Sequence, residues 1–195
     1  MTSEPSIIAA HALISSQIPT LSALLNVAGV LRDDAMNIAP ERRIDDFTPE
    51  SSLASFQVNA IGPMTMAKHF HSLLTPPRSK TPTPPSIFVN FSARVGSITD
   101  NGLGGWSSYR ASKAAANAFL KTLSHELKRQ NVAVVSVHPG TVDTDLTRAF
   151  LSARAKYDVQ GVDEAALKLM TLFDTFTVEE HGGKFFDHKG EEVPW

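Results

Sequence analysis

Tyr109 and Lys113 are the two residues of this chain whose types and spacing could do chemistry. They lie four positions apart in the sequence. In a helix this spacing places the phenol and the ammonium on one face. A nearby cation favours the phenolate, so we expect the pKa of Tyr109 to fall from its usual value of about 10 toward neutral pH. A phenol tuned in this way can give a proton to a substrate oxygen or take one from it.

The elements that must position this pair are short apolar strands that alternate with helices. The pattern predicts strands over 21–27, 87–91, 132–137 and 183–187, and helices over 6–16, 49–74, 107–129 and 163–173. Such alternation is typical of crossover units, so the sequence predicts an α/β fold with a parallel sheet covered by helices. Pro63, inside the second helix, is expected to bend it or loosen one turn.

The size and composition of the chain exclude several function classes. Its 195 residues suit one domain over 1–195, and the proline-rich run 75–85 is predicted to be a surface loop, with a docking site for a proline-binding domain as the lesser alternative.

A formal charge of −2 without a basic stripe argues against nucleic acid as a partner. The absence of Cys excludes disulfides and thiolate metal ligands, and no metal site is expected. No run approaches the ~18 apolar residues of a membrane helix, and the acidic start lacks a basic signal, so a cytoplasmic location is expected.

Polar residues and glycines gather where the predicted strands end. In an open parallel sheet, ligands bind beyond the carboxyl ends of the strands. Each group alone is weak evidence of a binding site. A tyrosine with a lysine four residues later is commonly a solvated pair, and Pro-Gly commonly forms the turn that ends a strand. Together they form a consistent set, in this order: 26–29, 92–97, Tyr109 with Lys113, and 139–144.

This order of motifs resembles the short-chain dehydrogenase/reductase family, in particular its small C-factor-like carbonyl reductase branch. The similarity runs from about Ser6 to Trp195 and implies a partial Rossmann-like, doubly wound parallel sheet. The motifs that carry it are Asn26-Val27-Ala28-Gly29, Val58-Asn59-Ala60, Ser92-Ala93-Arg94-Val95-Gly96-Ser97-Ile98, Gly104-Gly105-Trp106, Tyr109-Arg110-Ala111-Ser112-Lys113 and Pro139-Gly140-Thr141-Val142-Asp143-Thr144.

The resemblance implies an NADP- or NAD-dependent oxidoreductase that reduces a carbonyl or oxidises a secondary alcohol. Tyr109 would be the general acid in reduction and the base in the reverse direction. Lys113 would lower the pKa of Tyr109 and hold the nicotinamide ribose, and Asn59 would anchor a water that relays protons to Lys113. The remaining cofactor contacts implied are Asn26, Ala28 and Gly29 for the adenosine side, Pro139, Gly140 and Val142 for the nicotinamide, and Thr144 for the diphosphate.

The sequence departs from the family pattern in two ways. The family serine that orients the substrate carbonyl is replaced here by Ala93. Ser92 is expected to point to the other face of the strand. Ser97 lies just past Gly96, where the chain can turn back toward Tyr109, and it is predicted to be the substitute.

The second departure is larger, because no G-x-x-x-G-x-G motif occurs in the sequence. By the family order, the sequence begins near the end of the third family strand. Two strand–helix units, about 60 residues, would then be missing on the N-terminal side. The diphosphate would lose its nest of backbone donors, which puts cofactor binding in doubt. Strand 21–27 would become an edge strand with partly uncovered apolar side chains.

Other functions compete with this one. A non-catalytic remnant of the family, or an incomplete gene model, could act only as an interaction partner, and the family's homodimers usually pair through the two long helices. A sugar-nucleotide epimerase can share the Tyr–Lys spacing, but no substrate domain follows the last predicted strand. A metal hydrolase is disfavoured because His69 and His71 are two residues apart and therefore not on one helix face. The substrate is expected to be a small carbonyl compound or alcohol, bound by the segment from Thr144 to Asp163.

Overall fold

The structure is a computed structural model that describes residues 2–75, 83–148 and 158–195. Its centre is a four-stranded sheet in the order β1-β2-β3-β6, and all three pairings are parallel. The strands are β1 (Ala23–Asn26), β2 (Ser86–Phe91), β3 (Val132–His138) and β6 (Phe185–Asp187), with a separate pair formed by β4 (Thr141–Val142) and β5 (Val159–Gln160). The predicted α/β class and parallel sheet are confirmed.

The four helices that the sequence pattern predicts are present, with ends shifted by a few residues, and one short helix over 145–148 was not predicted. The α-helices are α1 (Glu4–Ser15), α2 (Pro49–Phe56), α3 (Gly62–Leu74), α4 (Ser107–Leu127), α5 (Asp145–Arg148) and α6 (Val162–Phe173). Shorter turns are η1 (Ile44–Asp46), the π-helical η2 (Gln57–Ile61), η3 (Arg94–Gly96) and η4 (Lys128–Gln130). No helix in the described part of the chain is both long and apolar enough to cross a membrane.

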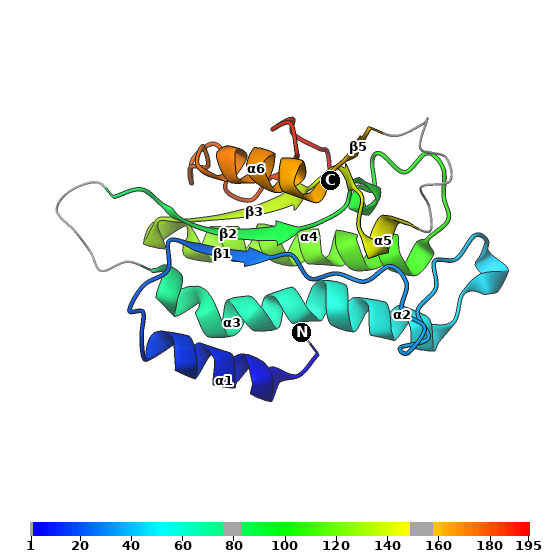
Figure 1. The fold of residues 1–195 in the computed structure, drawn as a ribbon, viewed down its shortest axis with the longest axis horizontal. Coiled ribbons are helices and arrows are strands. Elements are labelled where there is room, and N and C mark those ends of the chain that lie inside the picture. The colour runs from blue at the N-terminus through cyan, green and yellow to red at the C-terminus, as the bar shows by residue number, and fades with distance from the viewer. Residues whose placement is uncertain (1, 76–82, 149–157) are drawn as a thin grey trace.

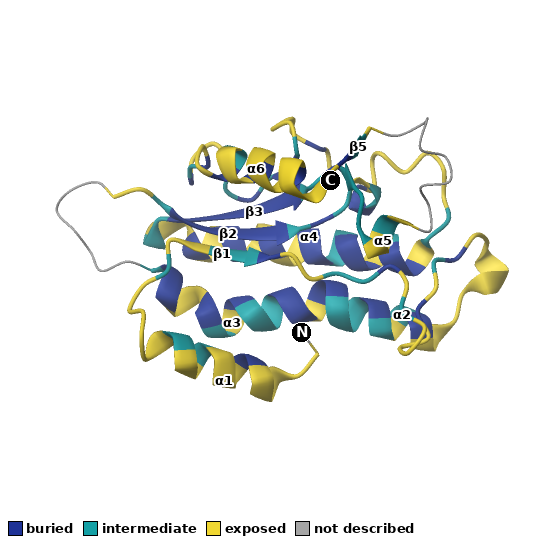
Figure 2. Ribbon diagram, in the orientation of Figure 1, coloured by how far each residue is buried: buried dark blue, intermediate teal, exposed yellow. Residues whose placement is uncertain are grey.

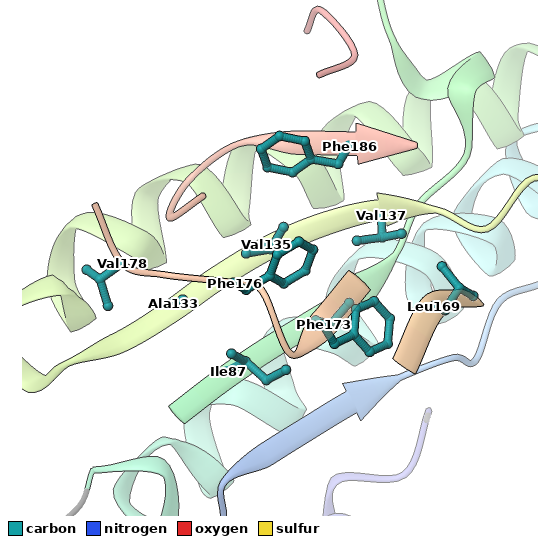
Figure 3. Packing of buried hydrophobic residues seen from close by; sticks show 10 residues of the cluster. Ile87, Ala133, Val135, Val137, Leu169, Phe173, Phe176, Val178 and Phe186 are labelled. Carbon is teal, nitrogen blue, oxygen red and sulfur yellow. The ribbon is translucent and has the colours of Figure 1, made fainter. Parts of the chain in front are cut away.

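The molecule has helices on both faces of the sheet, which explains why its strands are apolar on both sides. Figure 1 shows α6 on one side of the strands and α3 with α1 on the other. Alternate residues of the central strands point to opposite layers. Ile87 and Val135 pack with Phe173 on the α6 side, as Figure 3 shows. Phe88 and its neighbours pack instead against α3 and α4, and Figure 2 shows β2 and β3 buried up to their last residues, which are half-buried.

The long helix predicted over 49–74 contains a loosened turn. Thr48 caps its start by accepting a hydrogen bond from the Ser51 amide at 3.3 Å. Helix α2 then passes into the π-helical segment η2, and α3 follows. Pro63 has no N–H to donate to the carbonyl of Asn59, four residues earlier. The expectation that Pro63 loosens a turn is therefore confirmed.

Strand β1 lies at the edge of the sheet, as predicted. Its only partner in the described sheet is β2. Leu24 and Leu25 are half-buried, and Val27, just past the strand, is 62% exposed. The apolar side chains along this edge are thus partly uncovered.

The predicted surface loop over 75–85 lies largely outside the described residues. Only its two ends are described, at Thr75 and at 83–85. The Thr75 hydroxyl lies within hydrogen-bond distance of two acceptors, the Gln130 side-chain oxygen at 2.7 Å and the His71 carbonyl at 3.1 Å, which share its one proton. The end of α3 is thereby tied to η4.

Candidate active site

Tyr109 and Lys113 lie on one buried face of α4, close to its N-terminus. Only 8% of Tyr109 and 3% of Lys113 is exposed. The Lys113 Nζ atom lies 5.8 Å from the centre of the Tyr109 ring. The prediction that the two side chains share a helix face is confirmed. Because α4 starts beyond the carboxyl ends of the strands, the pair lies at the edge of the sheet where ligands bind in such folds.

The predicted fall in the pKa of Tyr109 is wrong in this structure. Burial raises the pKa of Tyr109 to about 12. Burial also lowers the pKa of Lys113 to about 8. Loss of water disfavours the charged form of each group, and this cost exceeds what one ammonium lying beside the ring can offset. At neutral pH the phenol therefore keeps its proton, and most of the lysine stays charged.

The Lys113 ammonium is buried with few partners. It donates a hydrogen bond to the Phe91 carbonyl at 2.8 Å, and no described carboxylate lies within salt-bridge distance of it. Two glycines make room for this side chain. A Cβ atom at Gly29 would lie 3.0 Å from Nζ, and a Cβ atom at Gly96 would lie 2.8 Å from the Cβ of Lys113. The loops after β1 and β2 both close on this one lysine.

Asn59 ties the loop after β1 to α4. Its side-chain oxygen accepts a hydrogen bond from the Val30 amide, and its amide group donates to the Val30 carbonyl, both at 2.8 Å. The same amide group donates to the Ser112 hydroxyl at 3.1 Å. Asn59 is 1% exposed. A Cβ atom at Gly29 would also lie 3.5 Å from its side-chain oxygen, so Asn59 borders the same space as Lys113.

The other residues predicted after β1 line a different part of this edge. Asn26 is buried and donates to the Asn90 side-chain oxygen at 2.6 Å, so it joins two strands of the sheet. Ala28 is exposed and Gly29 is half-buried. Gly29 begins the lining of a cleft of about 420 Å³ that continues to Asp34 and is closed by Asp145 and Leu146 of α5. Sequence reasoning did not identify this cleft, because it forms between segments far apart in the chain.

The predicted residues after β3 form a compact turn. Gly140 has a φ of +82°, and a Cβ atom there would lie 2.6 Å from the Gln160 side-chain nitrogen. Glycine is required here by both the backbone and the space. Val142 pairs with Gln160 between β4 and β5, and the Thr144 amide donates to the Thr147 hydroxyl at 3.2 Å. Pro139 and Val142 are half-buried. Much of the predicted substrate segment, 149–157, lies outside the described residues.

Ser97 directly follows Gly96, the glycine that closes on Lys113, and its hydroxyl is held by another partner. It is 1% exposed, and its hydroxyl oxygen accepts a hydrogen bond from the Asp100 amide at 3.1 Å. Ser92 is also buried, and its hydroxyl has no hydrogen-bond partner among the described residues. The role of Ser97 in place of Ala93 stays a prediction.

Sequence reasoning missed Glu41, which lies outside all the strands and helices predicted from the sequence pattern. Glu41 is 3% exposed, and its carboxylate accepts hydrogen bonds from the Ser108 amide at 3.3 Å and from the Ser108 hydroxyl. These contacts lie at the first turn of α4, directly before Tyr109. No local signal could have found them, because Glu41 and Ser108 are 67 residues apart.

A layer of buried polar atoms lies between α4 and the sheet. Asn90 and Ser136 face each other across β2 and β3, and Asn117 follows Lys113 by one helical turn. Four side-chain atoms in this layer are buried without a partner among the described residues. They are the nitrogen of Asn90, the hydroxyl oxygen of Ser136, and the nitrogen and oxygen of Asn117. Apolar packing begins with Leu120, one turn further along α4. The polar side of this interface is therefore the side next to Lys113.

Comparison with known proteins gives one consistent family. The family model for short chain dehydrogenases matches residues 1–155. The chain is 30% identical over 196 residues to the 1-hydroxy-2-glutathionyl-2-methyl-3-butene dehydrogenase of Rhodococcus sp., covering all of this chain and 77% of that protein. It spans between 56% and 60% of the length of the fungal oxidoreductases that it also matches.

Solved structures show the same relationship. The carbonyl reductase Sniffer of D. melanogaster superposes with a TM-score of 0.85 at 25% identity, covering 100% of this chain and 75% of that one. The NADPH-bound carbonyl reductase from chicken fatty liver superposes with a TM-score of 0.82 at 25% identity, covering 100% of this chain and 74% of that one. This chain therefore belongs to the short-chain dehydrogenase family of oxidoreductases.

Proposed function

We propose that this protein reduces a small carbonyl compound with a nicotinamide cofactor, and oxidises the corresponding secondary alcohol in reverse. Tyr109 is the proton donor in reduction. The observation that carries the proposal is the buried Tyr109–Lys113 pair at the carboxyl ends of the strands. With a pKa of about 12, the Tyr109 phenol holds its proton at neutral pH, which is the state that a general acid needs.

The residues around Lys113 fit a nicotinamide ribose. A buried ammonium has three donors, and here only the Phe91 carbonyl accepts from it among the described residues. Such a cation lacks acceptors, which the two hydroxyls of a ribose would supply at little steric cost beside Gly29. The bound nicotinamide would supply the hydride that adds to the carbonyl carbon.

The protein's own residues would handle the proton and the orientation of the ligands. Tyr109 would give its hydroxyl proton to the carbonyl oxygen, and the charged Lys113 would stabilise the phenolate that forms. Asn59, which borders the same space, would hold the water through which Lys113 exchanges protons with solvent. Ser97 would orient the carbonyl, because its hydroxyl oxygen accepts from Asp100 and its proton stays available to donate.

The remaining contacts are proposed for NADP or NAD without a choice between the two. Gly29 borders the space beside Lys113 and lines the cleft that faces α5, which supports an adenosine-side contact. Asn26 and Ala28 would complete that side. The turn after β3 would meet the nicotinamide through Pro139, Gly140 and Val142, and the diphosphate through Thr144.

A binding and turnover experiment tests the proposal. NADPH and NADH are titrated separately into the purified chain, and turnover is then measured with a panel of small aldehydes and ketones. We expect saturable binding of one cofactor and measurable reduction. The Tyr109→Phe variant should keep the cofactor affinity and lose about 100- to 10,000-fold in kcat, the range typical of a lost general acid.

Lys121→Met is the matched control for Lys113→Met, because Lys121 lies on the same helix but is exposed. We expect Lys113→Met to lose cofactor affinity and turnover, and Lys121→Met to change neither. Wild-type protein that binds neither cofactor would refute the proposal and favour a non-catalytic member of the family.

A further inference from the structure

The entrance to α4 has an unusual backbone. Three successive residues, Gly104, Gly105 and Trp106, have φ values of +66°, +69° and +54°. A left-handed conformation is easy for glycine but costly for a residue such as Trp106. Trp106 is also the N-cap of α4, and its side chain makes no capping hydrogen bond. The first amides of α4 therefore need acceptors from elsewhere.

Glu41 supplies those acceptors from a distant part of the chain. Its carboxylate accepts from the amide and the hydroxyl of Ser108, and its main-chain carbonyl accepts from the Trp106 amide at 2.6 Å. A carboxylate is favoured at a helix N-terminus by both hydrogen bonding and the helix dipole. Glu41 thus serves as the cap that Trp106 does not provide.

Arg110 holds the other side of the same turn. Its Nε atom donates to the Gly105 carbonyl at 2.8 Å, and one terminal nitrogen donates to the Gly104 carbonyl at 3.1 Å. The second terminal nitrogen donates to the Val95 carbonyl at 3.2 Å. The planar guanidinium therefore joins the left-handed turn to η3, which packs against α4 beside Lys113.

The reacting tyrosine rests directly on this turn. The ring of Trp106 meets the ring of Tyr109 edge to face, with centres 6.3 Å apart and planes at 79°. Tyr109 itself lies between Ser108, which Glu41 holds, and Arg110. A shift of the turn would therefore move the phenol relative to Lys113.

We propose that Glu41 and Arg110 are positioning residues, which clamp the left-handed turn before α4 and so fix the Tyr109 phenol for proton transfer. This inference rests on the proposed function. Neither residue touches the reacting atoms in this arrangement. Glu41 acts through Ser108 and Trp106, and Arg110 acts through the carbonyls of the turn.

The test compares variants that keep or remove the acceptor at position 41. Glu41→Gln keeps an oxygen that can accept from Ser108, whereas Glu41→Leu has a similar size and no acceptor. We expect Glu41→Leu to lower kcat about 100-fold with KM nearly unchanged, the scale expected for a misplacement of about 1 Å. We expect Glu41→Gln to restore kcat to within about threefold of wild type, since a neutral acceptor makes a somewhat weaker hydrogen bond.

Two further variants serve as the control and as a second, independent test of the clamp. Glu50→Leu is the control, because Glu50 is an exposed acid in the first turn of α2, where Thr48 already caps the helix. It should leave kcat unchanged. Arg110→Lys keeps the charge but cannot reach three carbonyls at once. Arg110→Lys should therefore lower kcat about as much as Glu41→Leu does. If Glu41→Leu does not fold, Arg110→Lys replaces it in the test.

A readout that needs no turnover separates this inference from the proposed function. Amide hydrogen exchange over 107–112 should speed up at least tenfold in Glu41→Leu and Arg110→Lys but not in Glu50→Leu. If wild type shows no turnover while exchange responds in this way, the proposed function fails and the clamp remains. Unchanged exchange in both clamp variants, or equal kcat in Glu41→Leu and Glu41→Gln, would overturn the inference.

Discussion

The two halves of α4 meet the same sheet in opposite ways. Its C-terminal half packs Leu120, Leu123 and Leu127 against the apolar face of β2 and β3. Its N-terminal half buries Asn117 and Lys113, whose ammonium donates to the Phe91 carbonyl of β2. The C-terminal half buries apolar surface, which stabilises the fold. The N-terminal half buries an ammonium and several amide and hydroxyl groups that have no partner among the described residues, which costs stability.

This difference separates the part of the interface that holds the fold from the part that carries the chemistry. Burying polar groups without partners is tolerated where a function needs them. The apolar half must therefore compensate for the polar half. Substitutions in the two halves should change the free energy of unfolding in opposite directions, and the following expectations test that contrast.

The largest change is expected in the apolar half. Phe88 is fully buried among α3 and α4 residues. Phe88→Ala should lower the free energy of unfolding by about 4 kcal/mol, through lost burial and the cavity left behind. Denaturant unfolding measures this loss. Phe47→Ala is the control, because Phe47 is 42% exposed and its removal should cost well under half as much. Equal losses in the two variants would contradict the contrast.

The next change is a rise of stability with pH. The pKa of Lys113 is about 8 in the folded chain, against a usual value of 10.5. Below pH 8 the lysine is charged in both states. Between these two values the unfolded chain binds the proton and the folded chain does not, so raising the pH favours the folded state. Wild type should gain up to about 3 kcal/mol over this range relative to Lys113→Met.

Tyr109 acts in the opposite sense at higher pH. Its pKa is raised from 10.0 to about 12, so between these values the folded chain holds the proton and stability falls as the pH rises. Subtracting the curve of Lys113→Met leaves the lysine contribution, since Tyr109 is present in both proteins. A difference curve that stays flat between pH 8 and pH 10 would contradict the low pKa of Lys113.

Lys113→Met itself should stabilise the protein at neutral pH. The substitution removes a buried ammonium, and the loss of its hydrogen bond to the Phe91 carbonyl offsets part of that gain. We expect a net gain of about 2 kcal/mol together with loss of turnover. Thermal or denaturant unfolding at pH 7 measures it, with the exposed Lys121→Met as the control that should change little. A destabilised Lys113→Met would show that the ammonium has partners in solution that compensate its burial.

The smallest change is expected at Asn117. Both atoms of its amide group are buried without a partner among the described residues. Asn117→Leu should therefore raise the free energy of unfolding by about 1 kcal/mol, since it extends the apolar half of α4 by one turn. Denaturant unfolding is again the measurement. A loss of stability would instead show that water fills this layer and satisfies the amide.

Local spacing predicted the part of the site that one helix carries. Tyr109 and Lys113 share a face because four residues make about one turn, and the structure confirms it. The alternation of strands and helices likewise predicted the parallel sheet, and the comparison with the family order predicted the edge position of β1. Pro63 predicted the loosened turn at η2, since the lost hydrogen bond depends only on the proline itself.

Properties that depend on distant packing could not be predicted in the same way. The pKa of Tyr109 was expected to fall, but burial raises it, and burial is set by the whole fold. Glu41 caps α4 across 67 residues, so no local pattern marks it. The single-domain organisation, the role of Ser97 and a homodimer through the long helices stay predictions.

The π-helical turn η2 also limits how this chain can change in length. A π turn holds one more residue than an α turn, and Asn59, which contacts both Val30 and Ser112, lies within this turn. Removing one residue between 57 and 61 would restore α-helical winding and rotate α3 against α2 by about 100°. Ala67, Phe70 and Leu74 would then leave their buried positions. A single-codon deletion in η2 should therefore be far more harmful than one at the exposed Thr83 or Pro84, which precede β2.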